Sequence, residues 1–243
     1  VIYKAMQGSL EREVAVKTLI PERANAKSRE KFVSEALVTG ALDHPNVVPV
    51  HELGRNQEGE VFLAMKLVDG RSWKDLLHPR NDEDRAASAI YTLEKHIDIL
   101  LDVANAVSFA HSRGILHRDL KPENVMVGAY GETLVMDWGI AVDIREPAPH
   151  RPRAPHKDGV KGPAGTPVYM APEVLAGAGA TALSDQYAFC LALDEALGEP
   201  DAFYPAWLRG LGLFPGPTHH PEVEATLSAA RGLLIEQATV LRD

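Results

Sequence analysis

The first third of the chain alternates apolar and polar residues with the period of two that is typical of β-strands. This alternation predicts strands at residues 13–19, 47–53 and 61–68, with a polar turn at residues 54–59 between the last two. Residues 23–42 are rich in helix formers and carry apolar side chains at helical spacing. We therefore expect a small sheet that carries one helix.

In the following part of the chain the apolar residues recur every three or four positions, which is the period of a helix. This pattern predicts a short helix at residues 73–77 and a long amphipathic helix at residues 96–113 that ends at Gly114. It also predicts a helix at residues 185–197 that is apolar on almost all sides and therefore buried. Residues 81–87 are polar and charged, and we expect them to form a loop.

The remaining segments predict a hairpin, a loop and a last helix, so that the whole chain is predicted to have an α+β fold. Short apolar runs at residues 125–127 and 133–136, separated by a turn at residues 128–132, predict a tight hairpin. Residues 143–165 are rich in Pro and charge and predict a loop without a regular element. A final helix is expected at residues 221–241.

Composition narrows the class of protein. The chain has 243 residues, of which 45% are hydrophobic and 24% charged, as in a globular protein with a real core. Its net charge of −9 argues against a dedicated nucleic-acid or anionic-membrane binder. No apolar run reaches the ~18 residues of a membrane helix. The single Cys190 excludes an intrachain disulfide, fits a cytoplasmic location, and is expected to be buried and inert.

Residues 117–124 bring three kinds of reactive side chain into one short loop. Asp119 could orient a hydroxyl nucleophile, and Lys121 could neutralise a phosphoryl oxygen. Asn124 could bind a hard cation through its amide oxygen, and Asp137 offers a second oxygen ligand further along the chain. A pair of ligands with no His or Cys favours Mg²⁺ over zinc.

Lys17 lies within an apolar strand, so its amine needs a partner, and Glu35 on the following helix is the nearest acidic residue to consider. Positioning and charge neutralisation are most of phosphoryl-transfer catalysis, and these residues supply both. Each residue also has a purely structural interpretation. Lys17 could extend to solvent, Glu35 could lie on a solvated helix face, and Asp119, Asn124 and Asp137 could be turn formers.

Taken in order, these motifs resemble a Hanks-type (eukaryotic-type) serine/threonine protein kinase of the bacterial kind. The matches are Val-Ala-Val-Lys at 14–17, Glu35, His-Pro-Asn at 44–46, His-Arg-Asp-Leu-Lys-Pro-Glu-Asn at 117–124, Asp-Trp-Gly at 137–139, Gly-Thr-Pro-Val-Tyr-Met-Ala-Pro-Glu at 165–173 and Ser-Asp-Gln-Tyr at 184–187. The resemblance implies a bilobal fold. Residues 1–65 would form a β-rich N-lobe with one helix, 66–70 a hinge, and 71–243 a mainly helical C-lobe that is shortened after residue 198.

The resemblance also implies a role for each matching residue, with ATP and Mg²⁺ as cofactors and a protein Ser or Thr as the phosphoryl acceptor. Lys17, paired with Glu35, would hold the α- and β-phosphates, and Asp119 would be the catalytic base. Lys121 would contact the transferred phosphoryl group, and Asn124 and Asp137 would bind Mg²⁺. Thr166 would support the catalytic loop, and Asp185 would brace the backbone of that loop. The adenine pocket would be lined by Ile2, Ala15, Met65, Lys66, Val68 and Met126.

The chain departs from the family pattern in several places. The glycine-rich phosphate loop is absent, so we expect a fragment of a longer protein that binds ATP weakly and turns it over slowly. The Arg expected to pair with Glu173 is replaced by His in the 216–221 region, and Trp138 replaces a Phe.

The segment between Gly139 and Gly165 has no Ser, Thr or Tyr, which argues against activation by phosphorylation there. Arg118 then needs another partner, for which Asp143, Glu146, Asp158 or water are possible.

Three functions remain open from the sequence. The first is an active Ser/Thr protein kinase that acts in signalling. The second is a pseudokinase-like binding module, which the shortened C-terminal part favours and the intact Lys17, Asp119, Asn124 and Asp137 disfavour. The third is a small-molecule phosphotransferase, a class that lacks the segment resembling residues 165–173. No membrane segment is predicted within the chain, although an anchor outside this segment stays possible.

Overall fold

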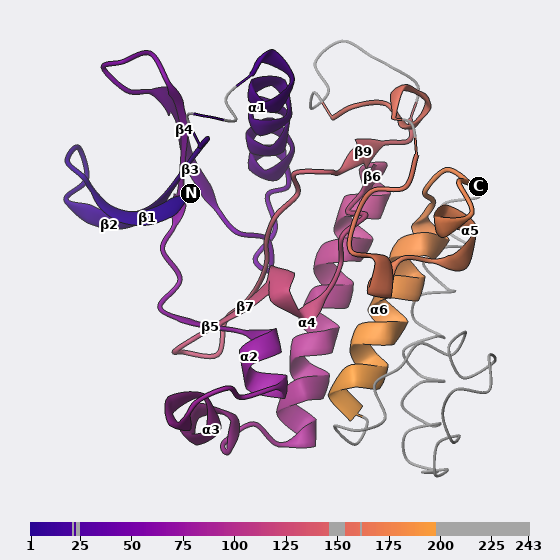
Figure 1. Cartoon of the computed structure of the whole chain (residues 1–243). Helices are drawn as coiled ribbons and strands as arrows, with labels where there is room; N and C mark the ends of the chain where they lie inside the picture. Colours follow the sequence, from indigo (N-terminus) through magenta and orange to yellow (C-terminus); the bar gives the residue numbers. More distant parts are fainter. Residues whose placement is uncertain (21, 23–24, 146–153, 161, 198–243) are drawn as a thin grey trace.

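The computed structural model describes the chain except for residues 21, 23–24, 146–153, 161 and 198–243. Its first part is a four-stranded antiparallel sheet in the order β1-β2-β4-β3 with one helix beside it (Figure 1). The elements are β1 (Ile2–Gln7), β2 (Arg12–Thr18), α1 (Ala26–Ala41), β3 (Val50–Arg55) and β4 (Val61–Lys66). The predicted strands and helix are present, with ends shifted by a few residues.

The alternation in β2 decides which side chains share a face of the sheet. Val14 and Val16 pack with Ala64 in one cluster, whereas Ala15 packs with Val48 and Met65 in another. Because the side-chain period of a strand is two, Lys17 lies on the face of Ala15. The strand therefore presents its one lysine next to an apolar surface.

Helix α1 is anchored on the sheet by Phe32 and Ala36, which form a buried cluster with Val61 and Leu63 of β4. Asn25 caps the helix, since its side-chain oxygen accepts a hydrogen bond from Ser28 N (2.9 Å). Packing and cap together fix the rotation of α1 about its axis. This rotation decides where Glu35 lies.

Strand β1 was not predicted from the sequence. It pairs with β2 along its whole length, from Ile2 opposite Lys17 to Gln7 opposite Arg12. Its side chains are mostly exposed, so no apolar alternation marks it. Hydrogen bonding to β2, a non-local interaction, makes this segment a strand.

The second part of the chain is mainly helical. Its helices are α2 (Trp73–Leu77), α3 (Asp82–Ser88), α4 (Leu93–Ser112), α5 (Pro172–Leu175) and α6 (Ala182–Leu197). Its strands are β5 (Gly70–Ser72), β6 (Ile115–Leu116), β7 (Val125–Gly128), β8 (Thr133–Val135) and β9 (Val142–Asp143), arranged as a β5-β7-β8 sheet and a β6-β9 pair. The β7–β8 hairpin and the positive φ of Gly114 (71°) agree with the sequence pattern.

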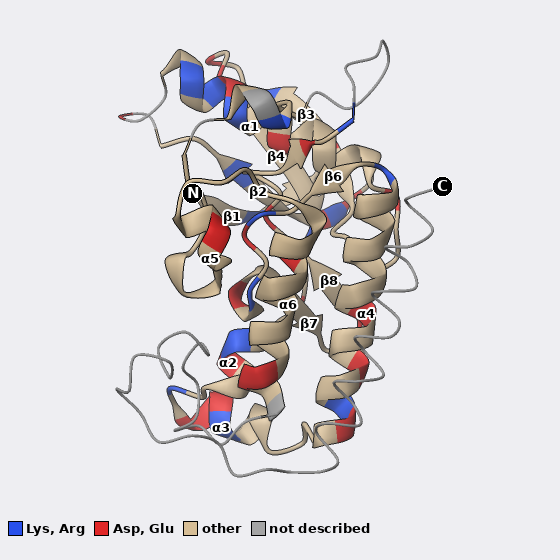
Figure 2. Ribbon diagram, turned by 90° about the vertical axis from the view of Figure 1, so that its right-hand side faces the viewer, with Lys and Arg blue, Asp and Glu red and all other residues tan. Residues whose placement is uncertain are grey.

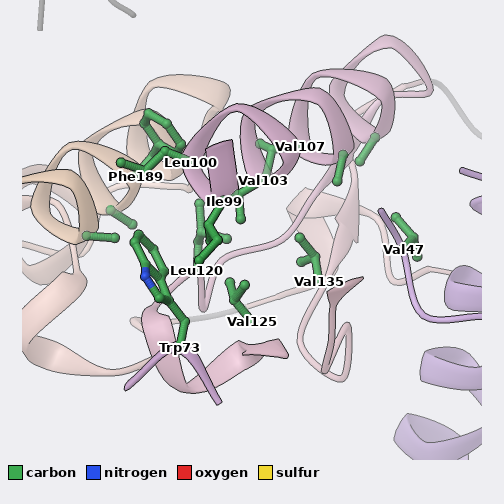
Figure 3. Packing of buried hydrophobic residues seen from close by; sticks show 14 of the residues in the cluster. Val47, Trp73, Ile99, Leu100, Val103, Val107, Leu120, Val125, Val135 and Phe189 are labelled. Carbon is green, nitrogen blue, oxygen red and sulfur yellow. The ribbon is translucent and has the colours of Figure 1, made fainter. Parts of the chain in front are cut away.

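The main core lies where α4 packs against α6 and β8. Figure 3 shows buried α4 side chains, among them Ile99 and Val103, between Phe189 of α6 and Leu120 and Val125 of the segment after α4. Complete burial of such a side chain contributes about 1.5–3 kcal/mol. The loop at residues 117–124 is thus fastened to the core through Leu120, which is 1% exposed.

The predicted loop at residues 81–87 is wrong, because this segment forms α3. Asn81 caps the helix by accepting a hydrogen bond from Asp84 N (2.8 Å). Asp84 is itself buried and forms an ion pair with Arg71 of β5. A helix whose buried side chain is a carboxylate has no apolar stripe, so hydrophobic periodicity cannot reveal it.

Two further expectations need correction. Cys190 is exposed rather than buried, and Leu183 on the same helix is 65% exposed; neither belongs to the buried cluster that α6 shares with α4. Residues 143–165 include the end of β9, which pairs with β6, and a 3-10 turn at Lys157–Gly159.

The predicted helix at 221–241 and the His residues near Pro221 lie outside the described residues. Within the described ranges, no helix combines the length and apolar character needed to cross a bilayer.

Candidate active site

A cavity of about 230 Å³ lies between the β1-β2-β4-β3 sheet and the β7–β8 hairpin. Its walls include seven residues that the sequence predicts for the site: Ile2, Lys17, Glu35, Met65, Asn124, Met126 and Asp137. Ala15, Lys66 and Val68 are not among the described residues that line it. Ala15 lies directly opposite Met65 in the β2–β4 pair and packs with it, and Lys66 forms an ion pair with Glu132 (3.1 Å).

Sequence reasoning did not identify the remaining lining residues, which are Thr39, Val48, Val50, Leu63, Glu123 and Met136. Leu63 could have been found, since alternation in β4 places it on the same face as Met65. Val48 and Met136 come from segments that meet only in the folded chain. They share a buried cluster with Ala15 and Met65, which makes this part of the cavity apolar.

Lys17 is held between two carboxylates at one end of the cavity. Its Nζ lies 2.5 Å from Glu35 Oε1 and 3.5 Å from Asp137 Oδ1. Burial alone lowers the pKa of Lys17, but the two carboxylates outweigh it and hold this pKa above its ordinary value. Burial also raises the pKa of Glu35, which the Lys17 ammonium offsets only in part. The result is a protonated amine next to an open space.

Gly139 leaves room for the two carboxylates. A Cβ atom there would lie 3.0 Å from Glu35 Oε2 and 3.1 Å from Asp137 Oδ1. Asp137 has a positive φ of 57°, and Met136 N donates a hydrogen bond to Asn124 O (2.8 Å). The backbone after β8 is therefore bent so that Asp137 comes close to both Lys17 and Asn124.

Asn124 and Asp137 form a donor set that fits Mg²⁺. Both described hydrogen bonds of the Asn124 amide are donated by Nδ2, to Asp119 O (2.7 Å) and Asp119 Oδ2 (3.2 Å), so its oxygen remains for a cation. The described residues contain no cluster of three or more His, Cys, Asp or Glu that could hold a metal. A cation bound here would complete its shell with phosphate oxygens and water, as Mg²⁺ commonly does.

Asp119 is the most heavily hydrogen-bonded carboxylate of the loop at residues 117–124. Its Oδ1 accepts hydrogen bonds from Thr166 N and Thr166 Oγ1, both at 2.7 Å. Lys121 Nζ lies 2.9 Å from Oδ2 and also donates to Thr166 Oγ1 (2.5 Å). Burial alone raises the pKa of Asp119, but Thr166 and Lys121 outweigh it and hold this pKa below its ordinary value. Asp119 is therefore an ionised acceptor of fixed orientation.

The close approach of the two segments depends on Gly165. It has a φ of 124°, and a Cβ atom at this position would lie 2.5 Å from Arg118 O. Only glycine fits such a backbone without strain. Gly165 therefore allows Thr166 to reach Asp119.

The backbone of the loop is held by Asp185 of α6, which is 1% exposed. Its carboxylate accepts hydrogen bonds from His117 N and Arg118 N, both at 2.8 Å, and lies 2.9 Å from His111 Nε2. Arg118 has a positive φ of 71°, a conformation that costs free energy for a residue with a side chain. The Asp185 carboxylate stabilises this turn from behind.

The His117 side chain is buried and hydrogen-bonded rather than placed to bind a metal. Its Nε2 is 3.0 Å from Met136 O, and its Nδ1 accepts a hydrogen bond from Asp119 N (3.2 Å). Its ring packs on Trp138 with 4.5 Å between centroids. Trp138 belongs to the same buried cluster as Val38 of α1, so the aromatic residue of the Asp-Trp-Gly motif contacts the core that supports Glu35.

Arg118 obtains its partner from the backbone. Its Nη1 donates to Ile140 O (3.1 Å), and burial lowers its pKa. Asp143, one of the expected partners, instead binds Arg145 (2.9 Å). Glu146 and the side chain of Asp158 lie outside the described part of the structure. The guanidinium thus has an acceptor that needs no phosphate.

Glu35→Gln is expected to lower both stability and the phosphotransfer activity that the resemblance implies, since it leaves the half-buried Lys17 ammonium without its nearest counter-charge. We expect a loss of about 1–3 kcal/mol in the free energy of unfolding, measured by urea denaturation. Glu30→Gln is the matched control, because Glu30 is an exposed residue of the same helix. Wild-type stability and activity in Glu35→Gln would contradict the importance of this pair.

The comparisons with known proteins agree with this geometry. The family described as "Protein kinase domain" matches residues 1–204. The chain is 32% identical over 250 residues to the serine/threonine-protein kinase PknJ of Mycobacterium tuberculosis, covering 98% of this chain and 39% of that protein. It is 30% identical over 213 residues to the serine/threonine-protein kinase PknD of Protochlamydia amoebophila, covering 81% of this chain and 21% of that protein.

A third relative is PknD of Chlamydia trachomatis (serovar D), which is 31% identical over 219 residues, covering 81% of this chain and 23% of that protein. The chain therefore spans well under half the length of these relatives. The matched region nevertheless contains every described element from β1 to α6 and both charged clusters around Asp119 and Lys17. The chain belongs to the protein kinase family, as a Hanks-type serine/threonine kinase domain of the bacterial kind.

Proposed function

We propose that the natural protein transfers the γ-phosphate of Mg-ATP to Ser or Thr hydroxyl groups of protein substrates. The observation that carries the proposal is the meeting of two charged clusters at Asn124. This residue lines the cavity that contains Lys17 and Asp137, and it also donates a hydrogen bond to Asp119. Nucleotide-binding groups and an acceptor-binding carboxylate are thus parts of one connected site.

On the nucleotide side, Lys17 would bind the α- and β-phosphates, and its ion pair with Glu35 would fix the position of the ammonium. Asn124 and Asp137 would hold Mg²⁺, which neutralises phosphate charge when bound. The adenine ring would lie against the apolar walls, for which we propose Ile2, Met65 and Met126 together with the neighbouring Ala15, Lys66 and Val68. Apolar walls of this kind suit a flat aromatic ring.

On the acceptor side, Asp119 would accept a hydrogen bond from the substrate hydroxyl and take its proton as the oxygen–phosphorus bond forms. The bond between the β- and γ-phosphates breaks in the same step, and ADP leaves. Lys121 would neutralise charge on the transferred group, and Thr166 would keep Asp119 in one orientation. Positioning and charge neutralisation by these side chains account for most of the catalysis.

We further propose that the chain divides functionally as residues 1–65, a hinge at 66–70, and residues 71–243. In support, every strand of the four-stranded sheet ends by Lys66, and β5 is the first element of the second part, pairing with β7. The Lys66–Glu132 ion pair joins the two parts next to the proposed hinge. A hinge here would let the cavity open and close around the nucleotide.

Two other functions are weaker candidates. A pseudokinase-like binding module does not require an ionised carboxylate held by three side chains, as Asp119 is. A small-molecule phosphotransferase does not require the Thr166–Tyr169 segment that contacts Asp119 and α6. Both alternatives predict no transfer of phosphate to protein.

The test is a phosphotransfer assay of the natural protein with labelled ATP and a generic basic protein, with Mg²⁺ and with a chelator. We expect Mg²⁺-dependent labelling of Ser and Thr, which Asp137→Ala abolishes because it removes one of two cation ligands. Asp82→Ala is the control, since its side chain is 98% exposed. Nucleotide binding without transfer would support the pseudokinase, and labelling that survives in Asp137→Ala would refute the proposed site.

Activity is expected to survive phosphatase treatment. The segment between Gly139 and Gly165 contains no hydroxyl group that could be phosphorylated, and Arg118 is satisfied by Ile140 O. The measurement compares kcat before and after treatment, with mass spectrometry to confirm that phosphate has been removed. A stoichiometric phosphate on Thr166 whose removal silences the enzyme would overturn this expectation.

A further inference from the structure

Helix α6 carries a second buried carboxylate that the roles described above do not use. Asp185 near the start of the helix holds the loop at residues 117–124, whereas Glu195 lies near its other end. The Glu195 side chain is 0% exposed. A buried carboxylate is costly unless it is paired and hydrogen-bonded, so its surroundings indicate what it is for.

Three donors from two other segments converge on Glu195. Lys74 of α2 and His78, the residue that caps the C-terminal end of α2, both contact Oε1, and the His78 distance is 2.6 Å. The Tyr169 hydroxyl donates to Oε2. Figure 2 shows α2 beside the C-terminal half of α6, which agrees with these contacts. Glu195 therefore joins α2 to the segment that contains Tyr169.

The chemistry of the cluster fixes the state of its members. A carboxylate oxygen only accepts, so the Nε2 atom of His78 carries a proton. Burial and the nearby Glu195 raise the pKa of Tyr169 above its ordinary value, so the phenol stays protonated and donates. Lys74 supplies a positive charge that makes the buried carboxylate tolerable. All three contacts are of the strong, charge-assisted kind.

Tyr169 connects this cluster to the proposed phosphoryl-acceptor side. Its backbone N–H donates to Thr166 O (3.0 Å), which closes the short turn Pro167–Tyr169. Thr166 contacts Asp119 through both its N–H and its hydroxyl. A shift of Tyr169 would therefore move Thr166 and release one oxygen of Asp119.

α2 gives the same cluster a fixed anchor, because strand β5 holds this helix on β7. This helix follows β5 directly, and β5 pairs with β7 so that Ser72 lies opposite Met126, which lines the cavity. Glu195 is the described residue on which both connections meet. Its position lies outside the cavity, so it acts only through other residues.

We propose that Glu195 is a positioning residue that ties the Thr166–Tyr169 segment to α2 and thereby holds Thr166 against Asp119. The inference rests on the proposed kinase function. It predicts that the cluster governs transfer to the protein acceptor and not the affinity for nucleotide. A purely structural cluster would instead change stability alone.

The test is a double-mutant cycle with Tyr169→Phe and Lys74→Met in the natural protein. Both variants keep the volume and the Glu195 carboxylate, so they avoid the folding risk of replacing Glu195 itself. We expect each to lower kcat for protein phosphorylation by about tenfold, the factor that losing one hydrogen bond to a charged group corresponds to. The Kd for Mg-ATP should stay within about twofold of the wild-type value.

Coupling is the decisive result. Each single variant lowers kcat by a certain factor. If Glu195 joins the two segments, the factor for the double variant is smaller than the product of the two single factors, because both substitutions act through one carboxylate. Lys74→Arg should restore activity because it keeps the charge. Tyr130→Phe and Lys27→Met are matched controls on exposed side chains.

The outcomes separate this inference from the proposed function. With an active wild-type protein, three results would overturn the positioning role. The first is a loss of kcat in the double variant equal to the product of the single losses, and the second is an unchanged kcat in Tyr169→Phe. The third is a loss of affinity for Mg-ATP as large as the loss of kcat. A wild-type protein that binds Mg-ATP but phosphorylates no protein would refute the proposed function, and the positioning role with it. Lower thermal stability with unchanged kcat would assign the cluster to structure alone.

Discussion

Asp119→Asn is expected to reduce phosphotransfer by a factor of about 10² or more, the contribution typical of a general base. The amide keeps the shape of the side chain and can still accept from Thr166, but it cannot take a proton. It also loses the charge that pairs with Lys121 at 2.9 Å. Single-turnover kinetics with saturating ATP isolate the chemical step from product release.

The matched control for Asp119→Asn is Asp82→Asn, which makes the same change on an exposed side chain. ATP affinity should be similar in both variants, because Asp119 is not among the described residues that line the cavity we propose for the nucleotide. Undiminished turnover in Asp119→Asn would remove this residue from the mechanism. An equal loss in Asp82→Asn would show that the assay reports on something other than the site.

Asp185→Ala is expected to have the largest effect on stability. It removes the acceptor of the buried His117 N–H, of the partly buried Arg118 N–H and of His111, at the turn where Arg118 has a positive φ. Breaking a buried charged network costs about 3–5 kcal/mol. Urea denaturation should show a lower midpoint, and kcat should fall because the backbone before Asp119 loses its support.

The pH dependence of stability supplies an independent check on Asp185. Burial alone raises its pKa, but His111, His117 and the backbone N–H of Arg118 outweigh burial and hold this pKa below the ordinary value. The stabilisation is therefore fully present above the unfolded-state pKa of ~3.9 and is lost as pH falls through the lower folded-state pKa. In Asp185→Asn, the free energy of unfolding should therefore depend less on pH in this acid range than it does in the wild-type protein. A wild-type free energy of unfolding that does not fall in this pH range would contradict the assignment.

The site could be predicted from the sequence to the extent that its residues are neighbours in the chain. Asp119, Lys121 and Asn124 lie in one loop, and their hydrogen bonds to one another follow from this proximity. The face of the sheet on which the Lys17 side chain lies follows from the alternation in β2. Glu35 was proposed from its order in the chain, and the distance of 2.5 Å agrees with it.

The rest of the site depends on segments that the sequence cannot bring together. Thr39, Val48 and Met136 line the cavity only because α1, the following loop and the end of β8 converge there. The cluster at Glu195 unites α2, α6 and the segment before α5, and each of its members looks like an ordinary polar residue in the sequence. Long-range contacts of this kind leave no periodic signal.

The sequence by itself determined the elements with strong local patterns: β2, β4, α1, α4 and the β7–β8 hairpin, together with the residue types of the loop at 117–124. Local propensity and alternation suffice for these, because each buries an apolar face of its own. Only the tertiary structure decided that residues 2–7 form a strand, that residues 82–88 form a helix and that Cys190 is exposed. These depend on a neighbouring strand, on the Arg71–Asp84 ion pair and on which side of α6 is covered, and all of these arise when the chain folds back on itself.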